Sequence, residues 1–228
     1  MLMALVSSAD KPAGSRPLQN RVDPFGELIA TPARGLFMGN RGGRIHDAGK
    51  LLGGRRWSSR RWIACVCEFK GRRRKVWGDS YTELFFLDEP TALAAGHRPC
   101  FECRRTDARW FAGAWAGRRR TPPSADEMDL VLHAERLNGR GKRRHIFVVD
   151  DLPDGAMLVE RGRPFAVHGD RLLPWGFEGY GPGITRPRGA LAEVLTPPAI
   201  LNALAHGYEP LWHPSAAAAA VVSMSIAS

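Results

Sequence analysis

Two cysteines, Cys100 and Cys103, are the residues of this sequence best suited to chemistry. Thiolates are strong zinc ligands, and the Cys-x-x-Cys spacing lets both sulfurs reach one ion from a single tight turn. The same spacing occurs in redox sites, where the motif follows a strand and begins a helix. Here a predicted helix comes before the turn, and Pro99 precedes the first thiol. We therefore interpret the motif as half of a zinc site.

The remaining ligands of this ion have several candidates. Cys65 and Cys67 would complete a site of four thiolates, but an alternating strand places both on one face with apolar neighbours. A free cysteine there packs as a small hydrophobe. His46 follows a glycine-rich loop whose backbone could wrap an ion. We rank Cys100 and Cys103 first, then Cys65, then His46 and then Cys67.

The charge balance points to a polyanionic partner. Lys and Arg number 33 against 23 Asp and Glu, a net charge of +10, and much of the excess is arginine in short runs. A phosphate polymer suits such a surface, because neutralising phosphates releases condensed counterions. We expect nucleic acid, DNA ahead of RNA, to contact Arg72, Arg73, Arg74, Arg98, Arg104 and Arg105. The plainer alternative is that arginine replaces lysine on solvated faces.

Acid–base chemistry has one candidate group. Asp129 and His133 lie four residues apart on a predicted helix, with Glu135 nearby. Such groups could act as acid and base or bind a second ion. The plainer interpretation is a solvated helix face with an Asp–His pair. The sequence contains no phosphate-binding glycine loop, His-Glu-x-x-His or Gly-x-Ser-x-Gly motif.

Strands around the cysteines would position them. Residues 62–69 alternate in polarity and predict a strand that carries Cys65. A hairpin turn at 70–72 and a returning strand over 74–77 are expected next, and another strand over 82–87.

Helix signals surround the Cys-x-x-Cys turn. Asp88 is the expected N-cap of a short helix that ends at Gly96, just before the turn. A second helix is expected to begin near Glu102. Ser124 and Glu127 form a capping box that predicts a third helix.

These patterns predict an α+β fold in two parts. A zinc-binding α+β unit is expected over 20–138, and a β-rich small barrel or curled sheet over 145–213. Residues 1–19 are expected to form a disordered arm and 214–228 a flexible tail. The strands predicted for the β-rich part are 146–149, 156–160, 164–167, 171–175 and 190–195, followed by a short helix through Leu204.

The sequence has only weak signals for targeting or membrane anchoring. No stretch approaches the about 20 apolar residues of a membrane span. The apolar start is too short for a signal peptide and lacks a basic beginning. We expect a cytoplasmic protein without a membrane partner. In the cytoplasm, paired thiols favour metal binding over a disulfide.

The run from Glu83 to Arg105 resembles the metal-binding domain of the Ada DNA-repair protein and its relatives. That family has a strand ending in aromatic residues, a short alanine-containing helix that ends in glycine, and then Arg-Pro-Cys-x-x-Cys. The matching residues are Phe85, Phe86, Ala92, Ala95, Gly96, Arg98, Pro99, Cys100 and Cys103. The resemblance implies zinc binding close to DNA phosphates.

Two features of the family bear on the other ligands. In Ada the first thiols are spaced Cys-x-x-x-Cys, and one of them accepts a methyl group from a DNA phosphotriester. This chain has Cys65-x-Cys67 instead, and no evident helix-turn-helix follows. Looser relatives, found attached to nucleases, carry a Gly-Asn…Ile-x-His segment upstream. Gly39-Asn40 through His46 is similar to that segment, which supports His46 as a ligand.

Three functions follow from the sequence. The first is a nucleic-acid-binding protein in which zinc is structural. The second is a nucleic-acid-processing enzyme, either an alkyl acceptor using Cys65 or Cys67 or a hydrolase using His133 and Glu135. The third is a non-catalytic scaffold whose basic charge is incidental.

Overall fold

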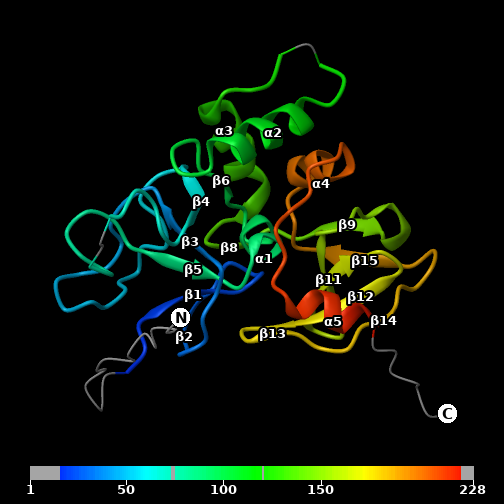
Figure 1. The fold of residues 1–228 in the computed structure, drawn as a ribbon, viewed down its shortest axis with the longest axis horizontal. Helices are drawn as coiled ribbons and strands as arrows, with labels where there is room; N and C mark the ends of the chain where they lie inside the picture. The colour runs from blue at the N-terminus through cyan, green and yellow to red at the C-terminus, as the bar shows by residue number, and fades with distance from the viewer. Residues whose placement is uncertain (1–15, 73–74, 120, 222–228) are drawn as a thin grey trace, which may run out of the picture.

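Two open β-sheets lie side by side, with α1 between them (Figure 1). The computed structural model describes residues 16–72, 75–119 and 121–221. The first sheet has the order β2-β1-β5-β3-β4-β6, and the second β13-β12-β11-β10-β15-β9, with β14 also paired to β12. This is an α+β arrangement, as predicted.

The first sheet carries the strand predicted to hold Cys65. Its strands are β1 (Gln19–Val22), β2 (Leu28–Ala30), β3 (Phe37–Arg41), β4 (Trp62–Val66), β5 (Leu84–Phe86) and β6 (Arg98–Pro99). The predicted strand over 62–69 is therefore shorter than expected. The returning strand is absent from its described part, 75–77. Trp77 has a φ of 56°, and its backbone N–H and indole N–H both donate to Glu83, so the chain turns inward there.

Five of the seven strands of the second sheet match the predicted strands to within one residue at each end, and the short strands Gly179–Tyr180 and Ile184–Thr185 are additional. It consists of β9 (His145–Val148), β10 (Met157–Glu160), β11 (Arg163–His168), β12 (Arg171–Gly176), β13 (Gly179–Tyr180), β14 (Ile184–Thr185) and β15 (Leu191–Val194). Two-residue loops at 161–162 and 169–170 join the central strands, with Gly162 and Gly169 at positive φ. Such loops match the twist of antiparallel strands. A separate hairpin, β7 (Leu137–Asn138) and β8 (Gly141–Lys142), lies between the sheets in sequence.

The second sheet does not close into the barrel that was one of the two predicted forms. Its inner face is covered by helices instead. Ala94 of α1 and Ala216 of α5 pack against Met157, Ala166 and Leu173 of the sheet. Helices thus fill the core that a closed barrel would fill with its own strands.

The helix signals in the sequence are largely confirmed. The helices are α1 (Glu89–Ala94), α2 (Arg105–Ala116), α3 (Ala125–Arg136), the 3-10 turn η1 (Val149–Asp151), α4 (Pro198–Ala205) and α5 (Ser215–Val221). Asp88 caps α1, and Ser124 with Glu127 forms the capping box of α3. The helix expected near Glu102 begins later, because residues 101–104 form a turn. The segment predicted as a flexible tail begins with α5. Of the arm predicted over 1–19, residues 1–15 lie outside the described residues, and Gln19 begins β1.

A buried polar network at the start of α1 joins the two sheets. Asp88 accepts hydrogen bonds from the Tyr180 hydroxyl at 2.9 Å and the His213 backbone N–H at 3.2 Å. The Trp175 indole donates to the Thr91 hydroxyl at 2.9 Å. The division predicted near residues 138–145 stays a prediction, and these bonds connect the segments on its two sides.

None of the helices in the described part of the chain is long and apolar enough to cross a bilayer.

We expect Asp88→Ala to lower the free energy of unfolding by about 2–5 kcal/mol, because it removes a helix cap and leaves buried donors unpaired. Urea denaturation followed by circular dichroism measures this loss. The exposed Asp151 provides the control, since Asp151→Ala should change stability by about 0.5 kcal/mol or less. An Asp88→Ala protein as stable as the control would contradict the role given to this network.

Candidate metal centre

Three cysteine sulfurs converge beside the edge of the first sheet. The Sγ atoms of Cys65, Cys100 and Cys103 all lie within 4.8 Å of one another. Parallel pairing of β4 with β6 sets Ala64 beside Pro99, and the Cys100 backbone N–H donates to the Ala64 carbonyl at 3.0 Å. The residue after β6 therefore lies next to Cys65, and the following turn returns Cys103 to the same point.

The turn directs backbone donors at its first sulfur. The Glu102 backbone N–H donates to the Cys100 Sγ at 3.4 Å, and the Arg104 N–H donates to the Cys100 carbonyl at 3.0 Å. The pKa of Cys100 is lowered, because the Cys103 and Cys65 thiols and the backbone N–H groups of Cys103 and Glu102 donate to its thiolate. The pKa of Cys65 is raised, because its proton is held by Cys100. Without a cation, the cluster thus favours one thiolate shared among three sulfurs.

The donor set fits a soft divalent ion. Zn–S bonds of about 2.3 Å place two sulfurs of a tetrahedral site about 3.8 Å apart, so the three sulfurs need little movement to close on one ion. Among the described residues, no fourth Cys, His, Asp or Glu joins the group. Cys65, Cys100 and Cys103 could hold a metal ion, with one coordination position left to another ligand.

His46 is not part of this cluster. Its Nδ1 lies 2.7 Å from the Thr82 hydroxyl and its Nε2 lies 3.0 Å from the Gly78 carbonyl. Its ring stacks on Trp77 with 5.0 Å between centroids. Both nitrogens that a metal would use are engaged, and the imidazole fastens the segment before β5 to the glycine-rich loop.

Cys67 is also outside the cluster. Strand β4 ends at Val66, so the alternation that would have placed Cys67 beside Cys65 does not continue. The Cys67 thiol is exposed and donates to the Leu36 carbonyl at 3.4 Å.

Two of the arginines predicted to contact phosphates are instead buried, and their ion pairs hold the cysteine turn in place. Arg98 is 4% exposed and makes a two-pronged ion pair with Asp129, at 2.9 and 2.8 Å. Arg104 is 6% exposed and pairs with Glu89 and Asp107, each at 2.8 Å. Their place beside the cysteines is correct, but their charge is used inside the protein and is not available to a ligand.

The other predicted phosphate contacts differ in position. Arg72 is exposed and pairs with Glu102 at 2.9 Å, and Arg105 is exposed at the start of α2. Arg73 and Arg74 lie outside the described residues.

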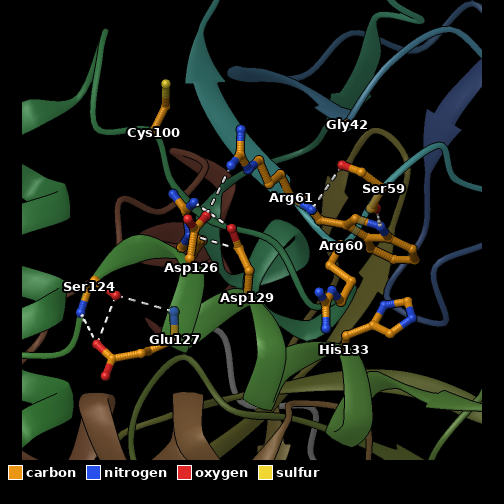
Figure 2. Close-up of polar contacts among 12 residues, drawn as sticks. Gly42, Ser59, Arg60, Arg61, Cys100, Ser124, Asp126, Glu127, Asp129 and His133 are labelled. Carbon is orange, nitrogen blue, oxygen red and sulfur yellow. Dashed lines mark hydrogen bonds and ion pairs between the residues drawn. The ribbon is translucent and has the colours of Figure 1, made fainter.

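The acid–base candidates on α3 all have structural partners, and Figure 2 shows two of the candidates, Asp129 and His133. Asp129 is held by Arg98. The Glu135 carboxylate accepts the Ala199 backbone N–H at 2.9 Å, near the start of α4. His133 Nδ1 lies 3.1 Å from the Arg136 guanidinium. Asp129 and Glu135 thus fasten α3 to other segments, while His133 contacts a residue of its own helix, and none of these contacts joins two of the three candidates.

A surface hollow of about 450 Å³ reaches the cysteine cluster at Cys100. Asn40, Arg61 and Phe101 are among its lining residues. A neighbouring hollow of about 490 Å³ shares Gly42 and Arg61 with it and includes Arg60. Figure 2 shows Arg61 beside Asp126, to which it is paired at 3.2 Å across the exposed surface. Arg60 and Arg61 are not among the phosphate contacts predicted from the sequence, although two adjacent arginines are a signal for a basic surface.

Comparison with known proteins found no family model that matches the chain, no matching curated protein and no matching solved structure.

We expect the chain to bind one Cd²⁺ through Cys65, Cys100 and Cys103. Replacing any one of them by serine should weaken binding by more than the about 10–100-fold that loss of an outer partner costs. Thiolate-to-metal charge-transfer absorbance during titration measures this. Cys67→Ser is the matched control and should bind as the parent does. Equal weakening by Cys67→Ser would contradict the assignment of Cys65, Cys100 and Cys103 as the ligands.

Metal binding should release protons. The pKa values of Cys65 and Cys103 are raised by their hydrogen bonds to Cys100, so both remain thiols near neutral pH. A metal needs them as thiolates, so binding should release about two protons per ion and strengthen as pH rises. Calorimetry in two buffers of different ionisation enthalpy measures the release. Binding that releases no protons would show that the cluster is already ionised.

Proposed function

We propose that this protein binds one zinc ion through Cys65, Cys100 and Cys103 and binds nucleic acid, DNA ahead of RNA, through the arginine-rich surface around that centre. The convergence of the three sulfurs within 4.8 Å carries the proposal. Zinc is mainly structural in this proposal.

The chemistry of the ligands supports zinc. Three thiolates from one strand and one turn are typical of zinc sites, and hard cations such as Mg²⁺ prefer oxygen ligands. A bound zinc ion supplies charge to neutralise the thiolates and links β4 to the turn before α2. The resemblance of residues 83–105 to the Ada metal-binding domain supports the same assignment from the residues alone.

The distribution of exposed arginines supports a nucleic-acid partner. Arg60 and Arg61 are exposed on the loop before β4 and line the adjoining hollows, one of which reaches Cys100. Arg105 is exposed just beyond the cluster. Arg98 and Arg104 are removed from the predicted set, but these side chains and Arg72 are exposed arginines that phosphates can reach.

A second candidate is a nucleic-acid-processing enzyme. It is favoured by the lack of a fourth protein ligand among the described residues, together with the hollow that reaches Cys100. A metal with an open position can take water or a substrate. Mass spectrometry after incubation with methyl-phosphotriester DNA tests the alkyl-acceptor form. A mass increase of one methyl group per chain would favour this candidate, and an unchanged mass would remove that form.

We expect about one zinc ion per chain by elemental analysis, and DNA affinity that falls steeply with salt. Each phosphate contact contributes about 0.9 to the slope of log affinity against log salt concentration for duplex DNA. Replacing both Arg60 and Arg61 by glutamine should therefore lower that slope by up to about 2. Fluorescence anisotropy with a labelled 5′-hydroxyl oligonucleotide measures this.

Arg163→Gln is the control for this experiment, since Arg163 is exposed on β11 of the second sheet. It should leave the slope unchanged within error if binding is confined to the surface around the metal centre. Absence of binding at low salt would remove the nucleic-acid part of the proposal and leave the metal part standing.

A further inference from the structure

A second basic site lies apart from the cysteine cluster, in a small cavity where β3, α3 and the β7–β8 hairpin meet. Arg41, Arg136 and Lys142 line it from these three elements. The cavity shares no lining residue with the hollow at Cys100. The three cations therefore form a separate feature of the molecule.

The two guanidinium groups are almost completely buried. Arg41 is 2% and Arg136 1% exposed, and their guanidinium carbons lie 4.0 and 3.9 Å from the centre of the Trp62 ring. Arg41 donates to the Gly26 carbonyl at 2.7 Å, and Arg136 to the Gly96 carbonyl at 2.9 Å. The Nε atom of each guanidinium has no hydrogen-bond partner in the part of the chain that the structure describes.

The third cation comes from the hairpin. The Lys142 ammonium donates to the carbonyl of the fully buried Ala94. Among the described residues, none of the three cations makes an ion pair. Glu27 lines the cavity, and Asp23 is nearby and buried enough that its pKa rises to about 6. Neither carboxylate pairs directly with one of the three cations.

Burial and mutual repulsion make this arrangement costly without an anion. Burial is the main cause that lowers the pKa of Arg41 and Arg136 to about 9 and that of Lys142 to about 7. Neighbouring cations contribute to each shift, and Glu27 and Asp23 offset part of the shift at Arg41. Lys142 and Arg136 donate to carbonyls at and just beyond the end of α1, whereas Arg41 donates to Gly26, so helix capping does not account for all three cations. Buried charges are stable when a partner of opposite charge is bound.

The cavity can admit an oxygen atom of a small oxyanion. About 20 Å³ of it is open to the centre of a water-sized sphere. One water molecule needs about 10–15 Å³ of such space, so a phosphate oxygen, which is of similar size, can enter. Arg56 and Arg140 also line the cavity, and Arg140 is exposed, so the site can be reached from solvent.

We propose that Arg41, Arg136 and Lys142 form a binding site for a phosphate group, either inorganic phosphate or the terminal phosphate of a nucleic-acid strand. Arginine forks and a lysine ammonium are the groups that proteins use for phosphate. The Nε atoms of Arg41 and Arg136, which have no partner among the described residues, leave each guanidinium with an unused donor. The site does not depend on the proposed function, since inorganic phosphate alone would occupy it.

Calorimetry and thermal melting with inorganic phosphate test the site, with chloride at equal ionic strength as the ionic control. Phosphate should raise the melting temperature by several degrees and chloride should not. Lys142→Met should weaken phosphate binding by about tenfold or more. Arg140→Gln changes an exposed residue that lines the cavity and should weaken it less, which keeps the test informative if Lys142→Met folds poorly. Arg163→Gln should bind phosphate as the parent does.

Two oligonucleotides of one sequence, with a 5′-phosphate and with a 5′-hydroxyl, distinguish the sources. Tighter binding of the phosphorylated strand that Lys142→Met abolishes would assign a strand terminus. Phosphate binding without that preference would assign inorganic phosphate, and either result supports the site. Failure of the parent protein to bind phosphate in any of these forms would overturn the proposal. Binding of the 5′-hydroxyl strand tests the proposed function separately.

Discussion

At the start of α1, two neighbouring carboxylates, Asp88 and Glu89, are at most 1% exposed. Buried charges need partners, and the partners of these two come from distant parts of the chain. Asp88 accepts from Tyr180 in the second sheet. Glu89 accepts from the Tyr208 hydroxyl at 2.6 Å and pairs with Arg104 beside the cysteine turn. The two acids thus fix the turn, α1 and the C-terminal segment relative to one another, and the geometry of the cysteine cluster depends on them.

Because buried acids need partners, they also determine which arginines are buried. Arg98 and Arg104 flank the Cys-x-x-Cys turn and are used to fasten it to Asp129 and Glu89. A buried ion pair adds little net stability, because desolvation offsets much of its attraction, so its main effect is to fix the geometry of the segments that it joins. The net charge of the protein therefore overstates what a ligand can reach. The charge available near the cluster belongs to side chains that lack a buried acid, such as Arg61, whose partner is an exposed carboxylate.

The loop between β3 and β4 connects the two basic regions. Arg56 lines the cavity of the buried cations, and Arg61 lines the hollow that reaches Cys100. Arg136 also donates to the Arg60 carbonyl at 2.8 Å, so the buried cations hold the loop that presents the exposed ones. The proposed phosphate site and the proposed nucleic-acid surface are in this way mechanically linked, although each has its own charges.

Local features were predictable from the sequence, because short-range bonds set them. The caps Asp88 and Ser124, five of the strands of the second sheet and the close approach of the Cys-x-x-Cys pair belong to this class. The resemblance to the Ada domain stays a prediction. Tertiary structure decided the third thiol. Parallel pairing of β4 with β6 selects Cys65, while the end of β4 turns Cys67 away. Tertiary structure also determined which arginines are buried and that helices pack against the second sheet. Both depend on contacts between residues far apart in sequence.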